Sequence, residues 1–293
     1  MSDAELTVTV TGTVATVVIR NPARRNALTS AMWRQLPVLL DGLEADPAVR
    51  ALVLTGADGT FCAGADLGDL DELLEAGDES IAVAAEERLA VFGKPTVAAI
   101  EGACVGGGCQ LAVACDLRLA AADARFGVPP ARLGLVYPAL TTRRLARLVG
   151  PSATKHLLFT SELVDAERAL RIGLVDEVLP AEALAARVAK VTSAIAERSR
   201  LTVAAAKEII DGRADDARIA WWHGQVRASG EAREGVAAAN ERRPPRFGWT
   251  PPVLRDARPA EAFLRVHPEV ADGSGRPVTP ETSVRSSSTD HWS

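Results

Sequence analysis

Residues 96–111 read TVAAIEGACVGGGCQL, and this stretch decides the fold. The run from Thr96 to Ile100 is typical of a buried strand, and the glycine triplet at 106–108 predicts the start of a helix that ends near Cys115. Glycines at a helix start leave backbone N–H groups uncovered, with the positive end of the helix dipole behind them. The stretch therefore predicts a strand, a turn and a helix whose first N–H groups can hold an anion.

The glycine triplet does not fit the common nucleotide-binding loops. The dinucleotide pattern GxGxxG is disfavoured because it needs glycine or alanine at position 111, where this chain has Leu111. A Walker phosphate loop is absent because no Gly-Lys-Ser/Thr follows the triplet. For the triplet taken alone, tight packing between a strand and a helix stays an equal alternative.

A second loop of small residues, GTFCAGADL at 59–67, precedes the triplet by about 40 residues. It follows a predicted buried strand, and its glycines and alanines allow the backbone to approach a ligand closely. Two backbone N–H donors that converge from separate loops form an oxyanion hole, and each donor can contribute on the order of 3 kcal/mol at a developing enolate. The pair of loops therefore indicates a site for a polarised carbonyl.

Outward from these loops, β-branched segments alternate with helical patterns, which indicates an α/β fold. Residues 11–13, TGT, predict a hairpin between the first two strands. The segment from Ser30 to Glu44 has one apolar helical face, and Pro37 inside it predicts a kink or a shortened helix. Pro180 opens a second amphipathic helix, and residues 201–240 are helical again. The predicted strands are Leu6–Val10, Val14–Ile19, Ala51–Leu54, Thr96–Ile100, Asp116–Ala120 and Leu174–Leu179.

The composition of the 293 residues is that of a globular protein, with 47% apolar residues and a net charge of -5. This charge disfavours nucleic acid and anionic membranes as partners, and no apolar run is long enough to predict a membrane span. The N-terminus lacks a signal-peptide pattern, so a cytoplasmic location is expected. The four cysteines have no CxxC spacing and are predicted to be buried, reduced thiols. Beyond Phe247 the chain is rich in Pro, Ser, Arg and Gly, which predicts disorder with a short helix at 260–265.

Five segments of the chain, in this order, form a recognisable set: NPARRNAL at 21–28, FCAGADL at 61–67, GGGCQLAVACD at 106–116, FGVPPARLGL at 126–135 and ERRPPRF at 241–247. Together they resemble the enoyl-CoA hydratase/isomerase family, also called the crotonase superfamily. The resemblance implies a spiral of ββα units with a C-terminal helical trimerisation region, a homotrimer or hexamer, and a coenzyme A thioester as substrate or ligand without a permanently bound cofactor. It implies a spiral core at 1–198, an oligomerisation region at 199–247 and a tail at 248–293.

The resemblance also assigns roles to residues. The N–H groups of Ala65 and Gly107 match the family's oxyanion hole. Arg242 matches a basic residue that meets CoA phosphates, often from a neighbouring subunit, and a cation suits the charge of CoA. Residues that match the region lining CoA and the acyl group are Arg25, Ala27, Leu28, Ala63, Asp66, Leu67, Gly106 and Leu133.

The chain departs from the family at both glutamates that its hydratases use for proton transfer. The matching positions hold Gln110 and Pro130. Glutamine cannot exchange a proton near neutral pH, and proline has no polar side-chain group. Since the loss of one acid–base group costs on the order of 10²–10⁴ in rate, we expect conventional hydration to be nearly abolished.

The chain's single tyrosine, Tyr137, favours decarboxylation as the first interpretation of the reaction. Its placement is similar to that of a tyrosine in the methylmalonyl-CoA decarboxylases of the superfamily, where a hydroxyl helps to orient a carboxylate. Loss of CO₂ creates an enolate without a base and leaves the oxyanion hole to stabilise it. Those decarboxylases carry histidine where this chain has Ala65. A structural role, with the ring packed and the hydroxyl bonded to backbone, is an equal alternative.

Two further hypotheses for the function stay open. Some actinobacterial members with glutamine at the first glutamate position bind acyl-CoA without hydrating it, which implies a carrier or sensor. Alternatively, Asp69, Asp71 or Glu72 supplies a displaced acid–base group, although stabilisation of a helix start explains these residues more simply. A serine hydrolase is disfavoured because no GxSxG occurs, and the four histidines form no metal-binding pair.

Overall fold

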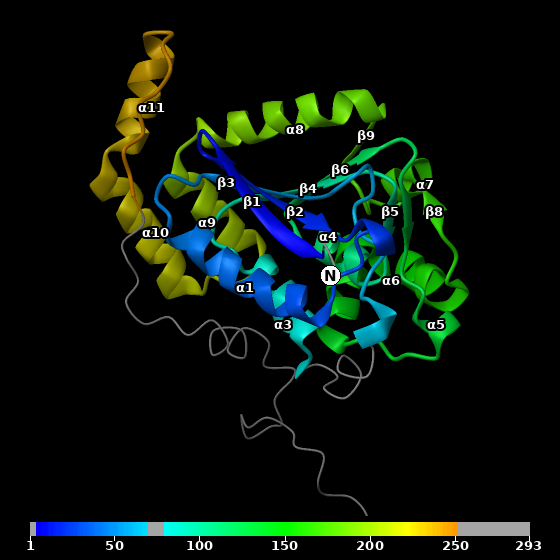
Figure 1. Cartoon of the computed structure of the whole chain (residues 1–293). Coiled ribbons are helices and arrows are strands. Elements are labelled where there is room, and N and C mark those ends of the chain that lie inside the picture. The colour runs from blue at the N-terminus through cyan, green and yellow to red at the C-terminus, as the bar shows by residue number, and fades with distance from the viewer. Residues whose placement is uncertain (1–3, 70–78, 251–293) are drawn as a thin grey trace, which may run out of the picture.

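The structure is a computed structural model that describes residues 4–69 and 79–250. Six strands form the main sheet in the order β1-β2-β3-β4-β6-β9 (Figure 1). β1 and β2 form the predicted antiparallel hairpin, and every other pair in this sheet is parallel. These strands are β1 (Glu5–Thr11), β2 (Val14–Arg20), β3 (Ala51–Gly56), β4 (Thr96–Ile100), β6 (Leu117–Ala121) and β9 (Glu177–Leu179).

The last predicted strand, Leu174–Leu179, is wrong at its first half, since only Glu177–Leu179 pairs with β6. Leu174 and Val175 are almost fully buried but lie in a turn, where the N–H of Leu174 donates to the carbonyl of Ala169. Leu174 and Val175 therefore contribute to the core from a turn. A short apolar run alone does not distinguish a buried strand from a buried turn.

A second sheet of very short strands, β5-β7-β8, was not predicted. Its strands have only two or three residues, too few to show an alternating pattern. They are β5 (Ala103–Val105), β7 (Arg125–Gly127) and β8 (Val164–Asp165). β5 leaves the carboxyl side of β4 and leads directly into the glycine triplet, so this sheet positions the start of the next helix.

Helices cover both faces of the main sheet (Figure 1). α8 lies over one face, where its Leu184 and Val188 pack against Val53, Val97 and Leu119. The other face carries the larger core, which includes side chains of α1, α3 and α4. The helices of this part are α1 (Ser30–Ala45), α3 (Ile81–Ala90), α4 (Gly107–Ala114), α5 (Pro130–Leu133), α6 (Ala139–Thr160), α7 (Ala166–Arg171) and α8 (Ala181–Ala196), with 3-10 turns η1 (Pro22–Arg24) and η2 (Leu67–Asp69).

The kink or shortening expected in α1 at Pro37 is wrong, because the helix continues without a break over 16 residues. Its apolar stripe is buried, including Met32, Leu36 and Leu40. Each such side chain contributes about 1.5–3 kcal/mol on burial, whereas one proline in a helix interior costs about 3 kcal/mol. The buried stripe therefore outweighs the lost hydrogen bond. The predicted cap is confirmed, since the Thr29 hydroxyl accepts from the N–H of Met32.

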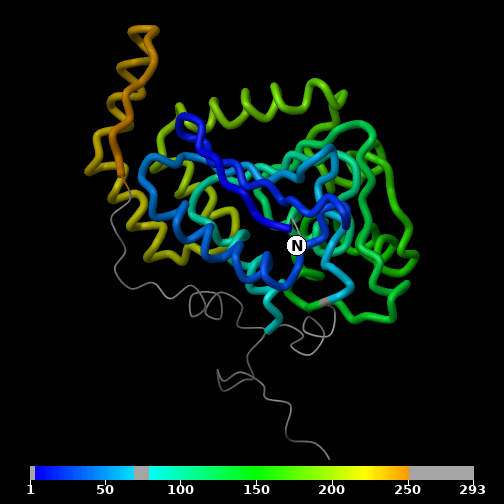
Figure 2. Tube along the Cα trace, viewed as in Figure 1, coloured from blue at the N-terminus to red at the C-terminus, as the bar shows by residue number. Residues whose placement is uncertain are grey.

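The C-terminal helices are α9 (Arg200–Ile210), α10 (Asp216–Ser229) and α11 (Glu231–Asn240). α11 projects away from the sheet, and the chain then runs back beside it (Figure 2). Arg243 pairs with Glu234, and the N–H of Trp249 donates to Glu231, which fixes this return. The predicted tail helix at 260–265 lies outside the described residues.

The order strand, strand, helix recurs as β1-β2-α1, β4-β5-α4 and β6-β7-α5, so the expected spiral of ββα units and the α/β class are confirmed. No helix in residues 4–69 and 79–250 is long and apolar enough to cross a membrane. All four cysteines are free and buried, as predicted.

One buried ion pair ties α9 to the sheet. Lys207 Nζ lies 2.7 Å from both carboxylate oxygens of Asp116, which also accepts from the N–H of Thr96. We expect Lys207→Ala to lower the free energy of unfolding by about 2 kcal/mol, because it leaves the partly buried carboxylate of Asp116 without its cation. Denaturant unfolding measures this loss. Lys190→Ala, on the exposed face of α8, should stay within about 0.5 kcal/mol of the native protein, and an equal loss in both variants would contradict the assignment.

Candidate functional site

The segments 25–28 and 63–66 lie side by side. The N–H of Leu28 donates to Gly64 at 2.8 Å, that of Asp66 donates to Leu28 at 2.8 Å, and that of Ala63 donates to Arg25 at 3.0 Å. The side-chain amide of Asn26 fixes this connection, since it donates to the carbonyl oxygens of Ala57 and Thr60. The structure thus brings together the two segments that the resemblance assigned to the same binding region.

The loop 62–65 is also joined to the strand that leads into α4. The N–H of Cys62 donates to Ala103 and the N–H of Val105 donates to Cys62. Gly64 has a φ of +110°, and a Cβ atom there would lie 3.1 Å from the carbonyl oxygen of Val105 and 3.5 Å from the nitrogen of Gly107. A larger residue at position 64 would therefore be strained and crowded, so glycine permits the close approach of the two loops.

The N–H groups of Ala65 and Gly107 are neighbours at this junction. A Cβ atom added to Gly107 would lie 3.7 Å from the nitrogen of Ala65. Gly107 is the first residue of α4, so its N–H has no partner within the helix. Within the described ranges neither N–H donates to a protein acceptor. Two unused donors close together at a helix N-terminus can hold a single partly negative oxygen atom.

The hydroxyl group of Tyr137 lies at the same place. It is 3.3 Å from the position that a Cβ atom of Gly106 would occupy. Burial, followed by the charges of Glu86 and Cys109, raises the pKa of Tyr137 well above its usual value, so the hydroxyl remains a proton-bearing donor. The ring packs against the core, and no described residue forms a hydrogen bond with the hydroxyl. The packed ring agrees with the structural alternative, whereas the bond from the hydroxyl to backbone that it also expects is not found among the described residues.

Gln110 lies one helical turn after Gly107 and is 1% exposed. Neither its Oε1 nor its Nε2 has a hydrogen-bond partner among the described residues. An unpaired buried amide costs about 1–3 kcal/mol, which calls for a ligand or water as its partner. Residues three apart share one face of a helix, so the amide lies on the side of Gly107. Pro130 is buried at the first turn of α5 and offers no donor.

Glu86 on α3 is a residue that the sequence reasoning missed. It is 4% exposed, and its Oε2 has no partner in the described part of the chain. Burial raises the pKa of Glu86 to about 8, with Arg144 opposing and Glu87 adding to the shift. A usable signal was present in the sequence, because Glu86 falls on the i, i+3 stripe between Val83 and Leu89, which are both buried.

The remaining predicted residues are distributed as follows. Ala27 is buried, whereas Leu67 and Leu133 are largely exposed. Arg242 follows the end of α11, the helix that projects away from the sheet, so this chain's own fold does not bring it to the two loops (Figure 1). Asp69 ends η2, and Asp71 and Glu72 lie outside the described residues.

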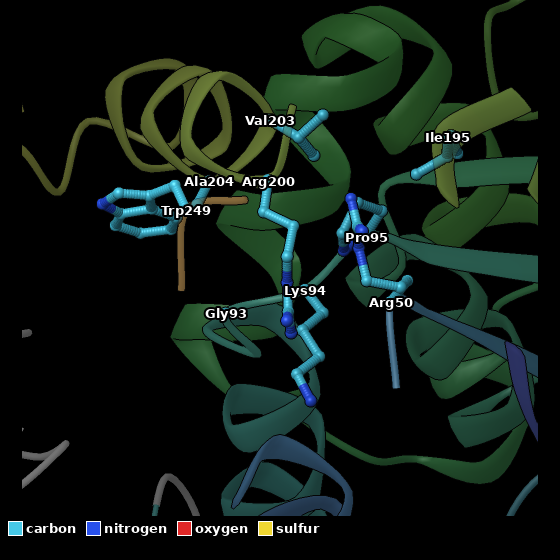
Figure 3. Close-up of a pocket in the computed structure, with 9 residues that line it drawn as sticks. All are labelled: Arg50, Gly93, Lys94, Pro95, Ile195, Arg200, Val203, Ala204 and Trp249. Carbon is cyan, nitrogen blue, oxygen red and sulfur yellow. The ribbon is translucent and has the colours of Figure 1, made fainter. Parts of the chain in front are cut away.

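A separate cavity lies where α9 meets the sheet, and it contains none of the predicted site residues (Figure 3). Arg50, Lys94 and Arg200 line it, and burial lowers the pKa of each. Arg50 donates to the carbonyl of Arg198, and Arg200 donates to that of Pro47. These bonds join the start of α9 and the residues just before it to the loop after α1, so the three cations have structural roles.

Two other kinds of chemistry find no support among the described residues. Burial raises the pKa of the Cys62 and Cys115 thiols to about 12, so they are poor nucleophiles. No group of three His, Cys, Asp or Glu side chains in residues 4–69 and 79–250 is arranged to hold a metal ion. His156 is half-exposed beside Glu162.

Comparisons with known proteins identify the family of this chain. Residues 9–249 match the family described as enoyl-CoA hydratase/isomerase. A Thermus thermophilus protein named "putative enoyl-CoA hydratase" is 41% identical over 251 residues, which is 80% of this chain and 98% of that protein. The crotonyl-CoA hydratase of Syntrophomonas wolfei is 35% identical over 244 residues, 80% of this chain and 94% of that protein.

Solved structures agree with the sequence comparisons. The crystal structure of an enoyl-CoA hydratase/isomerase family member superposes with a TM-score of 0.80 at 37% identity and covers 84% of this chain and 97% of that one. A family protein from Hyphomonas neptunium has a TM-score of 0.77 at 36% identity, over 84% and 98% of the two chains. The chain therefore belongs to the enoyl-CoA hydratase/isomerase family, whose enzymes act on CoA thioesters.

Proposed function

We propose that this chain binds an acyl-CoA thioester with the carbonyl oxygen between the N–H groups of Ala65 and Gly107, and that these donors stabilise the thioester enolate. The observation that carries the proposal is the approach of two N–H groups that have no acceptor in the described chain. An enolate concentrates negative charge on that oxygen, so the donors bind it more strongly than the neutral thioester. That difference is what accelerates a reaction.

The reaction we propose first is decarboxylation of a 2-carboxyacyl-CoA such as methylmalonyl-CoA. The bond between the α-carbon and the carboxylate breaks, its electron pair forms the enolate, CO₂ leaves, and the α-carbon then takes up one proton. Tyr137 and Gln110 support this choice, because a buried hydroxyl and an unpaired amide can donate to the substrate carboxylate. No base is required, which fits the absence of a carboxylate at Gln110 and Pro130.

A second candidate is hydration with a displaced acid–base group. The names of the similar proteins favour it, since several are called hydratases. The protonation state of Glu86 on α3 speaks against it. This buried carboxyl group is mostly protonated at neutral pH, so it cannot remove a proton from water. A carrier that binds acyl-CoA without turnover is the remaining possibility.

For the CoA moiety we propose Arg25 beside the 63–66 loop, joined by Arg242 from a neighbouring subunit of a trimer or hexamer. Arg25 is exposed and lies at the edge of the two hydrogen-bonded segments. The position of Arg242 after the projecting helix α11 supports this proposal, because it is away from the two loops of its own chain.

The test is a comparison of three CoA thioesters with the purified protein. We expect methylmalonyl-CoA to release CO₂. Crotonyl-CoA should be hydrated at least about 10²-fold more slowly than methylmalonyl-CoA is decarboxylated, and butyryl-CoA should bind saturably in calorimetry. Efficient hydration of crotonyl-CoA would replace decarboxylation with the second candidate. Absence of heat with all three thioesters would contradict the proposed binding site itself.

A further inference from the structure

We propose that Glu86 is the catalytic acid–base residue of this site, and that its carboxyl group exchanges a proton with the α-carbon of the bound thioester. The inference rests on the proposed function, because it requires the thioester to lie against Ala65 and Gly107. It goes further by assigning proton transfer to a residue outside the two positions that the family's hydratases use.

Glu86 lies on the buried face of α3, together with Val83 and Leu89. α3 packs against α4 and α6, and the charge of Glu86 acts on Tyr137, whose hydroxyl lies beside Gly106 at the start of α4. Glu86 therefore acts on a hydroxyl group that lies at the start of α4, next to Gly107. The proposal places the α-carbon of the bound thioester within reach of the Glu86 carboxyl group.

The fold itself leaves this carboxyl group unused. Although Glu86 is 4% exposed, its Oε2 atom forms no hydrogen bond within the described part of the chain. A structural carboxylate at this depth would be paired, because burying an unpaired polar group is costly. The next residue, Glu87, is a carboxylate with a structural role, since it forms an ion pair with Arg144. A buried carboxyl oxygen without a partner points to a polar ligand as its partner.

The protonation state of Glu86 suits the delivery of a proton. The charged groups that act on Glu86 are Arg144 on α6, which lowers its pKa, and Glu87 on its own helix, which raises it. The charge of Glu86 in turn acts on Tyr137, which precedes α6. On the side of α1, Asp41 and Glu44 bind Arg88. Burial exceeds the effect of Arg144, so the carboxyl is mostly protonated at pH 7. A neutral acid does not repel a substrate carboxylate, and it can deliver a proton to the enolate.

The proton balance of the step is closed. After CO₂ leaves, the electron pair of the enolate takes the proton from Glu86, which becomes a carboxylate and is reprotonated by water. In the reverse direction the Glu86 carboxylate removes an α-proton from a saturated acyl-CoA, and the C–H electron pair forms the enolate. In D₂O the carboxyl then returns deuterium to the α-carbon.

The experiment is exchange of the α-hydrogens of propionyl-CoA with D₂O, followed by mass spectrometry from pH 6 to 10. We expect the native rate to rise as the pH passes about 8, where Glu86 becomes a carboxylate. Glu86→Gln should lose about 10²-fold or more of this exchange and its pH dependence. Because the native carboxyl stays protonated at pH 7 while the unfolded one is ionised, the glutamine variant should unfold no more easily than the native protein.

Glu87→Gln is the matched control, since it makes the same change at the adjacent position. It should retain exchange within a few-fold. Loss of the Glu87 charge, which raises the pKa of Glu86, should move the inflection to lower pH. Equal exchange in native protein and Glu86→Gln, or no native exchange although propionyl-CoA binds, would overturn the role of Glu86 and leave the binding site intact. Absence of propionyl-CoA binding in calorimetry would instead overturn the proposed function.

Discussion

Ala65→Pro is expected to lower kcat/KM for the CoA thioester that the protein converts by on the order of 10²–10³. Proline has no N–H, so the variant removes one of the two donors, and its ring fills the space in front of that nitrogen. The N–H of Ala65 donates to no protein acceptor in the described chain, so the fold itself loses no hydrogen bond. Steady-state kinetics with the best substrate of the thioester comparison measures the loss.

The comparison variant is Ala65→Gly, which removes the methyl group and keeps the N–H. We expect it to remain at least about tenfold more active than Ala65→Pro, because the donor carries the effect. Thermal unfolding of both variants shows whether the loop still folds. If a well-folded Ala65→Pro protein kept native kinetics, the N–H of Ala65 would have no part in catalysis.

The double variant Gln110→Glu/Pro130→Glu should hydrate crotonyl-CoA on the order of 10² times faster than the native protein, or more. It supplies carboxyl groups at both positions where the family's hydratases carry glutamate. Position 110 is in the first turn of α4 and position 130 opens α5, and negative side chains are favourable at helix starts. Hydration is followed by the loss of enoyl absorbance.

The single variants are the controls for this gain. Each supplies one group only, so we expect each to hydrate crotonyl-CoA more slowly than the double variant, since water activation and protonation then depend on one residue. A double variant that folds, binds crotonyl-CoA and gains no hydration would show that Gln110 and Pro130 do not face the acyl group. Native hydration that is already fast would show that another residue supplies the missing chemistry.

The sequence predicted the parts of the fold that follow from local pattern. β4 coincides with the predicted Thr96–Ile100, and the glycine triplet opens α4 as expected. Short strands such as β5 carry no period, and the continuity of α1 through Pro37 depends on tertiary burial that no local rule contains. Tertiary burial also explains why the predicted strand at 174–179 was wrong in its first half, where Leu174 lies in a buried turn.

The candidate site was predictable only where it depends on backbone. Small residues in two loops indicated a pair of backbone donors, and the family resemblance assigned these to Ala65 and Gly107. The structure places the two residues close together. Glu86 was missed because charged residues in a helix usually face solvent, and its burial depends on the packing of α3 against α4 and α6. The unpaired state of Gln110 likewise appears only when the surrounding side chains are known.

The difference infrared spectrum of propionyl-CoA labelled with ¹³C at the thioester carbonyl, recorded free and bound, tests the paired donors most directly. Two hydrogen bonds polarise the C=O bond, so we predict that its stretching band moves to lower wavenumber on binding to the native protein, and that bound Ala65→Pro shows a smaller shift. An unshifted band in the native complex, or the same shift in both proteins, would contradict the paired-donor site.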